Sequence, residues 1–370
     1  MNEHVLPAPA DLHDRLAALE VLVEGTAVEA LSLDTASGWT RRTSVVVLSG
    51  GGAQGRGEDV TYAGPDHDDL QAGRIDLTAL QGRRTLGELF AVLDGLELFL
   101  APPAEAKAHR YRRWAFESAA LDLALTQAGT DLATVVGRAP APLAFGASLF
   151  LDGALDGPGF ARLEELRERL PDTRFKLDWA PGWDAVTLAR LADLGAVDVV
   201  DLKGHYLGDF RGPEPNPDAY RAVADALPEA WLEDAWLGGG MGGPWQGPTW
   251  QALEPFAERL TWDAPFGGLA DLTALPVEPR AVNVKPSRFG TLAELLAVLD
   301  HCVRRGIGAY AGGQFELGVG RAQLQLLAAL FFPGGANDCA PSSYNDRDLP
   351  VGLPGSPLAV DRGALGRASG

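Results

Sequence analysis

Short apolar runs alternate with amphipathic segments along the chain from residue 142 onward. In the segment 292–303, the leucines and Val303 recur at spacings of three and four residues, which is the period of a helix with one buried face. Repeated strand–helix units predict a parallel sheet with helices outside it, and seven or eight units favour closure into an α/β barrel. The predicted strands are 143–149, 174–177, 197–202, 230–233, 260–262, 281–284 and 307–315, and the other predicted helices include 160–170 and 186–194.

The N-terminal part of the chain follows another pattern. Its apolar runs predict strands, and a run of glycines at 50–52 predicts a turn. This pattern favours a small α+β unit in front of the barrel. The predicted elements are strands at 19–23 and 43–48, the stretch 53–60 after the glycine turn, loops at 24–42 and 61–69, a loose arm at 1–13 and a helix at 112–127. We therefore divide the chain into an N-terminal α+β capping domain (15–110), a barrel domain (111–345) and a closing C-terminal segment with a tail (346–370).

Composition and charge restrict the functions that the chain can have. The formal charge of −19 argues against binding to nucleic acid or to anionic membranes. No apolar run reaches the length of a membrane span, and the first residues have neither the basic start nor the apolar core of a signal peptide. Cys302 and Cys339 form neither a disulfide framework nor a zinc-binding spacing. We expect a cytoplasmic homo-oligomer that acts on a small molecule and has no nucleic-acid or membrane partner.

Lysine is rare in this chain, and its placement is informative. Four of the 31 basic residues are lysines, and three of them, Lys176, Lys203 and Lys285, come at the ends of apolar runs. Parallel barrels keep their chemistry at the carboxyl ends of their strands, so this placement predicts functional lysines. A general preference for arginine would account for the scarcity of lysine but not for its placement.

Acidic residues end three consecutive predicted strands. They are Asp201, Glu233 and Asp263, and about one strand–helix unit separates each from the next. Neighbouring strands of a barrel bring such residues to one rim, where unpaired buried carboxylates repel one another and lose hydration. A divalent cation relieves both penalties, and three oxygen ligands with room for water suit Mg²⁺. We therefore predict that these three residues bind Mg²⁺.

Two of the lysines are predicted to flank this metal. Lys176 comes one unit before the acids, and Lys285 comes one unit after them. This layout suits the removal of a proton next to the carboxylate of a small-molecule substrate. The metal would hold the carboxylate and stabilise the enediolate that forms, and its charge would lower the pKa of a nearby lysine so that it can act as a base.

Plainer structural roles are open for the same residues. The acids could cap the helices that follow their strands, and Lys285 could form an ion pair with one of them. Lys176 could hold a substrate carboxylate or neutralise Asp178. His205 is more simply a structural histidine than a ligand. Glu316 could orient a lysine or accept hydrogen bonds from the backbone.

The ordered set of residues at the strand ends resembles the enolase superfamily, in particular the branch of mandelate racemase and muconate-lactonizing enzyme. The resemblance spans nearly the whole chain and implies an α+β capping domain followed by a modified (β/α)7β barrel of the TIM type. It assigns the metal ligands of the third, fourth and fifth barrel strands to Asp201, Glu233 and Asp263, and a sixth-strand lysine to Lys285. The segment 312–320 resembles the seventh-strand pattern of the family. The resemblance implies a Mg²⁺-dependent lyase or isomerase that works through an enediolate, by dehydration, cycloisomerisation or epimerisation.

Two positions depart from the family pattern. The Lys-x-Lys motif at the end of the second strand is here Lys176-Leu177-Asp178, so an acid stands where the family usually has its base. The third-strand ligand is usually followed two residues later by Asn, and here that residue is Lys203, which could be a relocated catalytic group. These departures argue against racemisation with two bases and leave one-base chemistry at Lys285. The predicted catalytic residues are Lys285, Lys176, Asp178 and Lys203.

Two other functions remain open at this point. A barrel that keeps the metal site but lacks the second-strand base could bind a metal and a ligand without turnover. Alternatively, Lys285 could be a nucleophile that forms a Schiff base with a carbonyl substrate.

Overall fold

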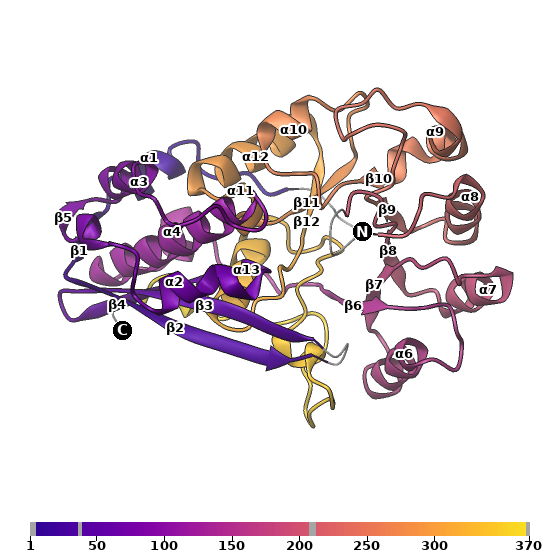
Figure 1. Ribbon diagram of the computed structural model, residues 1–370, viewed down its shortest axis with the longest axis horizontal. Helices are drawn as coiled ribbons and strands as arrows, with labels where there is room; N and C mark the ends of the chain where they lie inside the picture. The colour runs from indigo at the N-terminus through magenta and orange to yellow at the C-terminus, as the bar shows by residue number, and fades with distance from the viewer. Residues whose placement is uncertain (1–4, 36–38, 207–211, 368–370) are drawn as a thin grey trace.

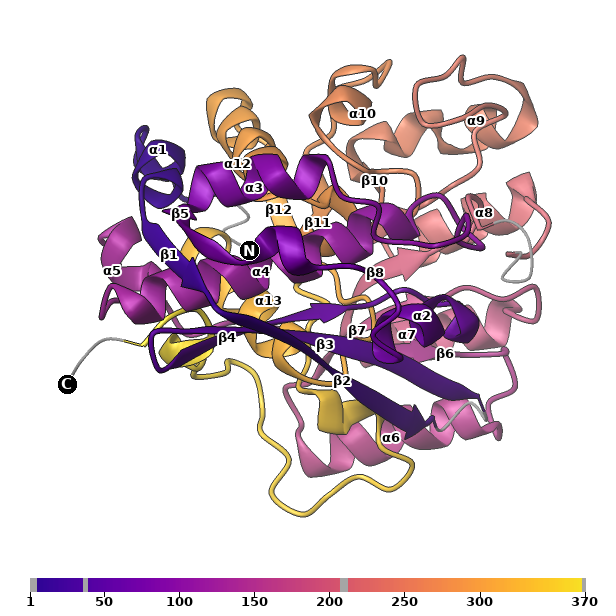
Figure 2. The same cartoon turned by 60° about the vertical axis from the view of Figure 1, so that its left-hand side comes forward.

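The computed structural model of the chain describes residues 5–35, 39–206 and 212–367. An α+β part lies against a barrel, as Figures 1 and 2 show. The elements of the α+β part and its connection to the barrel are α1 (Leu12–Ala17), β1 (Glu20–Val23), β2 (Gly25–Asp34), β3 (Thr40–Gly50), β4 (Ala53–Asp59), α2 (Asp68–Gln71), β5 (Gly82–Thr85), α3 (Leu86–Asp94), α4 (Ala108–Gln127) and α5 (Leu132–Val136). The elements of the barrel are β6 (Gly146–Phe150), α6 (Pro158–Arg169), β7 (Arg174–Asp178), α7 (Ala185–Leu194), β8 (Val197–Asp201), α8 (Pro217–Ala226), β9 (Trp231–Glu233), α9 (Gly247–Leu253), β10 (Leu260–Thr261), α10 (Leu269–Thr273), β11 (Ala281–Val284), α11 (Pro286–Phe289), α12 (Leu292–Arg305), β12 (Gly308–Ala311) and α13 (Val319–Phe331). Short 3-10 helices are η1 (Gly64–His67), η2 (Thr78–Leu80), η4 (Glu254–Arg259), η5 (Ser342–Asn345) and η6 (Arg362–Ala364).

An antiparallel sheet in the order β2-β3-β4 is the centre of the α+β part, and α4 packs against it. Two glycines of β4 allow a very close approach. A Cβ atom at Gly55 would lie 2.2 Å from the carbonyl oxygen of Ala119, and one at Gly57 would lie 2.0 Å from that of Ala115. Glycine is required in this strand because the backbone of α4 occupies the space that a side chain would need.

The prediction of a loop at 24–42 is wrong. Strand β2 covers ten residues of this segment and pairs with β3 along its whole length. It is an edge strand in which no side chain is fully buried, so no apolar alternation marks it in the sequence. Residues 36–38 of the segment lie outside the described residues. The predicted loop 61–69 contains η1 and the start of α2.

The prediction of a loose arm at 1–13 is wrong for the residues that the structure describes. Val5 and Leu12 are buried in the core, and α1 begins at Leu12. Residues 1–4 lie outside the described part of the chain. Near the other end of the chain, Leu365 is fully buried. Both ends of the described chain are therefore packed against the rest of the protein.

The barrel contains a parallel sheet in the order β6-β7-β8-β9-β10 and a parallel pair of β11 and β12. The extended segment 336–339 lies between β12 and β6. The N–H of Asp338 donates to the carbonyl oxygen of Ala311 at 2.7 Å, and the N–H of Gly146 donates to that of Asn337 at 2.9 Å. This segment takes the place of an eighth strand, although it is very short. The predicted capping domain and (β/α)7β barrel are confirmed.

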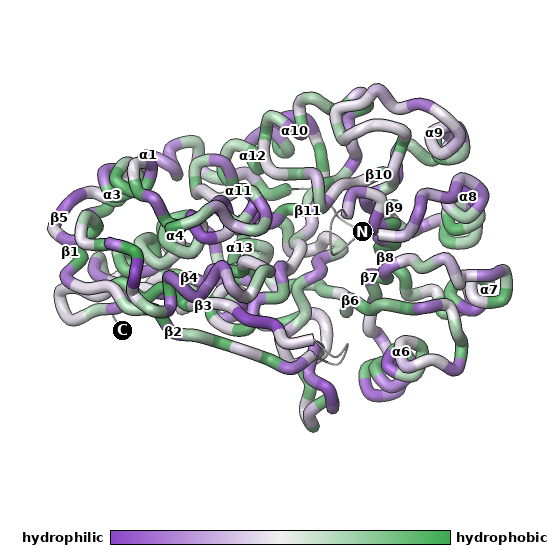
Figure 3. Tube along the Cα trace, in the orientation of Figure 1, coloured by the Kyte–Doolittle hydropathy of each residue, from purple (hydrophilic) through white to green (hydrophobic). Residues whose placement is uncertain are grey.

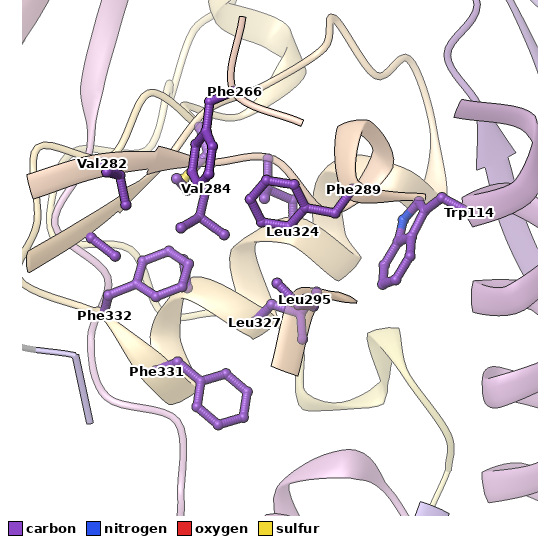
Figure 4. Close-up of a cluster of buried hydrophobic side chains, with 14 of the residues drawn as sticks. Trp114, Phe266, Val282, Val284, Phe289, Leu295, Leu324, Leu327, Phe331 and Phe332 are labelled. Atoms are coloured by element: carbon purple, nitrogen blue, oxygen red, sulfur yellow. The ribbon is translucent and has the colours of Figure 1, made fainter. Parts of the chain in front are cut away.

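The hydrophobic core has two parts. The small part fills the inside of the barrel and consists of Val199, Trp231, Ala281, Tyr310 and Ala336. The large part lies between the strands and helices of the barrel and continues into the α+β part. Figure 4 shows its region around β11 and α13, where Phe289, Leu324 and Phe332 gather. Apolar groups fill the inside of the barrel, and the polar side chains gather at its mouth, at the carboxyl ends of the strands.

The outer helices of the barrel are amphipathic. Polar and apolar positions alternate along α6, α7 and α8, and each helix buries one face (Figure 3). None of the helices in the part of the chain that the structure describes combines the length and the apolar character that a membrane span requires.

Asn337 joins the last strand of the barrel to its surroundings, and we expect Asn337→Ala to lower the free energy of unfolding by about 2–4 kcal/mol. The side chain is fully buried, donates to the carbonyl oxygens of Ala144 and Gly335 at 2.9 and 3.2 Å, and accepts from the N–H of Ala311 at 2.7 Å. Its removal leaves these backbone groups without partners. Denaturant unfolding measures the change. The control Asn216→Ala removes only the N-cap bond of α8 and should cost about 1 kcal/mol; an equally small loss in Asn337→Ala would contradict the assigned role.

Candidate active site

Three acidic side chains meet at the mouth of the barrel. Asp201 and Glu233 are the last residues of β8 and β9 and pair in the sheet, and Asp263 follows β10 by two residues. One carboxylate oxygen of each lies within 4.8 Å of the others, and all three residues are buried. The structure therefore brings together the three residues that the sequence predicts as metal ligands.

Each of these acids accepts a hydrogen bond from a different lysine. Lys203 Nζ donates to Asp201 Oδ2 at 2.6 Å, and Lys285 Nζ donates to Asp263 Oδ2 at 2.7 Å. Lys176 donates to Glu233. The three lysines at the strand ends thus lie at the acids, while the remaining lysine, Lys107, pairs with a glutamate elsewhere on the surface.

Lys176 has the most negative surroundings of the three. Its Nζ contacts Glu233 and lies 3.6 Å from Asp263 Oδ2, 3.8 Å from Asp201 Oδ2 and 3.6 Å from Asp338 Oδ2. Burial by itself would lower the pKa of Lys176, but the surrounding carboxylates outweigh it and raise the pKa well above the ordinary value. The surrounding carboxylates therefore favour the charged form of Lys176.

Lys285 differs from Lys176 although it is equally buried. Burial lowers the pKa of Lys285, and the nearby charges of Arg288 and Lys176 lower it further against the attraction of Asp263. Arg288 Nη1 lies 2.7 Å from Asp263 Oδ1, so the carboxylate lies between Arg288 and Lys285, with Lys176 farther away at 3.6 Å. A buried lysine with a lowered pKa is suited to accept a proton.

Lys203 and Asp178 form a pair at the edge of the site. Their charged groups are 2.9 Å apart, and Lys203 also contacts Asp201. Although burial by itself lowers it, the two carboxylates raise the pKa of Lys203 well above the ordinary value. Lys203 has a φ of 56°, and its N–H donates to Asp201 Oδ1 at 2.9 Å. Lys203 is thus held by its own backbone turn as well as by its side chain.

His205 and Glu316 have structural contacts. His205 Nε2 lies 3.1 Å from the carbonyl oxygen of Ala235, and its ring packs against Trp236. Glu316 accepts a hydrogen bond from the N–H of Gln314 at 2.7 Å and pairs with an arginine of α13. These contacts agree with a structural role for His205 and with Glu316 as an acceptor of backbone hydrogen bonds.

Several polar residues at the site are absent from the sequence prediction. Asn283 and Tyr310 donate to Glu233 Oε2 at 2.9 and 2.5 Å. Asn283 precedes Lys285 by two residues and pairs with Tyr310 in the sheet, so extending the strand alternation inward from Lys285 would have found both. Asp338 could not be found in this way, because the short segment 336–339 carries no strand pattern.

Asp234 orients the loop that carries the third acid. Its carboxylate accepts from the N–H groups of Asp263 and Ala264, both at 2.8 Å, and its φ is 55°. Burial, together with the charge of Asp201, raises the pKa of Asp234 well above the ordinary value. The carboxylate of Asp234 thus accepts from the backbone at and after Asp263 and sets where Asp263 lies.

The donors at this site fit a hard divalent cation. Among the described residues, the only group whose ligand atoms come close enough to share a metal is the carboxylate trio Asp201, Glu233 and Asp263. The trio offers oxygen only and neither imidazole nor thiolate, which suits Mg²⁺ better than zinc or copper. The pKa of Asp263 is lowered, because Arg288, Lys285 and Lys176 together outweigh the effect of burial, so this carboxylate is ionised and able to ligate.

Comparison with known proteins places the chain in a family. The domain of unknown function DUF8230 matches in two pieces, its N-terminal domain at residues 14–135 and its C-terminal domain at residues 139–346. The N-succinylamino acid racemase of an Amycolatopsis species is 28% identical over 325 residues, which are 84% of this chain and 82% of the racemase.

Solved structures show the same fold. The muconate lactonizing enzyme of Klebsiella pneumoniae superposes with a TM-score of 0.65 at 17% identity, covering 92% of this chain and 93% of its own. The dipeptide epimerase of Methylococcus capsulatus, solved in complex with a Mg ion, superposes with a TM-score of 0.61 at 21% identity, covering 85% and 89%. The predicted resemblance is confirmed, and these similar proteins carry the names of enzymes, as the sequence prediction expects. The chain belongs to the DUF8230 family, and its fold is similar to that of solved members of the enolase superfamily.

Proposed function

We propose that the protein is a Mg²⁺-dependent lyase or isomerase that removes a proton α to the carboxylate of a small substrate. The observation that carries this proposal is the meeting of three buried carboxylates within 4.8 Å beside Lys285, whose pKa is lowered. The names of the similar proteins, a racemase, an epimerase with bound Mg and a lactonizing enzyme, support the reaction class.

Asp201, Glu233 and Asp263 would hold the metal. When bound there, Mg²⁺ supplies positive charge that neutralises the substrate carboxylate and the charge that develops as the α-proton leaves. Asn283 and Tyr310 hold Glu233 by donating to one of its oxygens, which fixes the direction of the other.

Lys285 and Lys176 have different tasks because their pKa values are shifted in opposite directions. Lys285 is the general base: its amine accepts the α-proton and can return it to the intermediate or to a leaving group. Lys176 stays charged and attracts the substrate carboxylate as a fixed cation. The two lysines are thus divided between proton transfer and positioning.

The pair of Asp178 and Lys203 makes this a one-base site. Asp178 stands where a second lysine would act from the opposite face, and it pairs with Lys203, whose pKa is raised. Dehydration or cycloisomerisation on the Lys285 side needs no second base, whereas racemisation does. The same observation favours the second candidate function, a barrel that binds metal and ligand without turnover.

Deuterium exchange at the α-carbon tests the proposal. With Mg²⁺ in D₂O, the protein should exchange the α-proton of at least one member of a panel of N-succinylamino acids, dipeptides and muconolactones, and EDTA should abolish the exchange. Lys285→Ala should lower the rate by about 10²–10⁴-fold, whereas the surface variant Lys107→Ala should not change it. Exchange that persists in Lys285→Ala would exclude this base, and Mg²⁺ binding by calorimetry without any exchange would support the second candidate.

The pH dependence of the exchange rate tests the assignment of Lys285. The base is the neutral amine, so the rate should rise with pH through the pKa of Lys285 and then level off. Because burial lowers this pKa, the plateau should begin below about 10.4, the ordinary lysine value. Lys285→Arg keeps the charge but cannot lose its proton, and it should be inactive at every pH. A rate that continues to rise above pH 11, or an active arginine variant, would count against the assignment.

The two-sided pairing of Lys203 predicts a stability loss in Lys203→Met. The substitution leaves Asp178 and Asp201 facing each other without their shared cation, so we expect the free energy of unfolding to fall by about 2–4 kcal/mol. Thermal and denaturant unfolding without added metal measure this loss. The control is Lys107→Met, which removes a surface pair with Glu105 and should cost about 0–1 kcal/mol. Equal losses in the two variants would show that Lys203 is no more than a surface charge.

A further inference from the structure

The loop 312–320 links β12 to α13 at the mouth of the barrel, and Arg41 of β3 holds it from the capping domain. The guanidinium donates to the carbonyl oxygens of Gln314 and Phe315, both at 3.1 Å. On its other side it donates to two carbonyl oxygens just after β4, both at 2.7 Å. Arg41 is fully buried, and all four acceptors are main-chain atoms. It therefore joins the backbones of the two parts directly.

Glu58 of β4 holds the same loop by its backbone N–H groups, whereas Arg41 holds it by its carbonyl oxygens. Its carboxylate accepts from the N–H groups of Leu317, Gly318 and Gly320 at 2.7, 2.9 and 2.9 Å. These groups lie at the N-terminus of α13, whose N-cap residue is Gly318 and which has no side-chain cap of its own. A Cβ atom at Gly320 would lie 3.0 Å from Glu58. The capping domain thus supplies the negative charge that this helix end requires.

The loop between the two contacts is strained. Phe315 has a φ of 56°, a conformation that residues other than glycine rarely adopt. Arg41 binds the carbonyl oxygen of Phe315 and that of the preceding residue, and Glu58 binds the amides that begin two residues later. The strained residue is therefore enclosed between a cation on its carbonyl side and an anion on its amide side, which is the kind of support that such a conformation needs.

The side chain of Gln314 connects this loop to the proposed active site. Its amide lies between Tyr62 Oη at 3.1 Å and Arg288 Nη2 at 2.8 Å, and the orientation with the amide oxygen towards Arg288 gives both groups a suitable partner. Arg288 in turn lies 2.7 Å from Asp263 Oδ1, and Lys285 donates to the other oxygen of this carboxylate. A continuous line of polar contacts runs from the capping domain through Gln314 to the base and a metal-binding carboxylate.

We propose that Arg41 and Glu58 are positioning residues for the active site. They fix the loop 312–320 so that Gln314 orients Arg288, and Arg288 then sets the geometry of Asp263 and Lys285. The proposal rests on the proposed function only in the role given to those last two residues. It predicts that loosening the capping domain at Arg41 or Glu58 changes the mobility of α11, although no hydrogen bond or ion pair joins either residue to that helix.

Amide hydrogen exchange of Arg41→Lys, read without metal or substrate, tests the proposal. Lysine keeps the charge but not the planar set of donors, so the carbonyl contacts should be incomplete. Exchange should rise about tenfold in peptides covering 314–320 and also in those covering α11, while peptides of β6 to β8 stay unchanged. Glu58→Gln should give the same pattern, and it serves as the second variant should Arg41→Lys fail to fold.

The matched control is Arg112→Lys. Arg112 is another fully buried arginine; it contacts Asp59 and does not touch the loop 312–320. Its exchange changes should centre on the segments of its own partners, Asp59, Asp66 and Leu98, and leave the peptides covering 314–320 unchanged. The proposal is overturned if α11 is unchanged in both Arg41→Lys and Glu58→Gln, or if α11 responds equally to Arg112→Lys, because the effect would then be general destabilisation.

The α-proton exchange assay gives the second readout. With the substrate found in the panel, Arg41→Lys should lower kcat about tenfold and leave KM nearly unchanged, because the base is misplaced rather than the binding groups lost. A change in KM alone would count against positioning of Lys285. If no carboxylate reacts with the wild-type protein, the proposed function fails, while the amide exchange still decides the roles of Arg41 and Glu58.

Discussion

The structure depends on the balance of buried charge at the mouth of the barrel. Asp201, Glu233 and Asp263 lie so close together that their mutual repulsion and their lost hydration would open the site unless cations lay among them. Among the described residues, three lysines and Arg288 supply these cations, and each acid accepts a hydrogen bond from a different lysine. This requirement explains why a chain that otherwise prefers arginine places lysine at strand ends. The compact ammonium group of lysine can contact a single carboxylate in a crowded site, whereas the planar guanidinium group of arginine needs more room for its donors.

How far the sequence predicts the molecule depends on the range of the interactions. The seven barrel strands and the three acids were predictable, because each strand carries its own apolar run and each acid ends one. Strand β2 was missed because an edge strand buries little and shows no alternation. The eighth strand, with Asp338, was missed because it is too short to show a pattern. The roles of Arg41 and Glu58 could not be found at all, since their partners in the loop 312–320 lie more than 250 residues away along the chain.

Asp178 stands at the second lysine position of the Lys-x-Lys pattern. This difference changes the charge of the site as well as the number of groups that could act as a base. In the family pattern that position adds a positive charge to the mouth, with a neutral Asn on the next strand. Here the lysine is on the next strand, at Lys203, and Asp178 neutralises it. The mouth therefore has one positive charge fewer than the pattern implies. The remaining cations, Lys176, Lys285 and Arg288, all lie on the acid cluster, so the positive charge is gathered on one side of the site.

The contacts of the capping domain follow from the same requirement that every buried charged group has partners. Arg41 and Glu58 are buried ions, yet neither uses the other as its partner; each is satisfied by backbone groups of the loop or of its own domain. A clamp on the backbone leaves the side chains of the loop free, so Gln314 can face Arg288 while Phe315 packs against the aromatic ring of Trp39. If side-chain pairs joined the two parts instead, the side chains of the loop would be occupied by these pairs and could not contact the site. Because the attachment uses main-chain atoms, one short segment can both join the domains and serve the site.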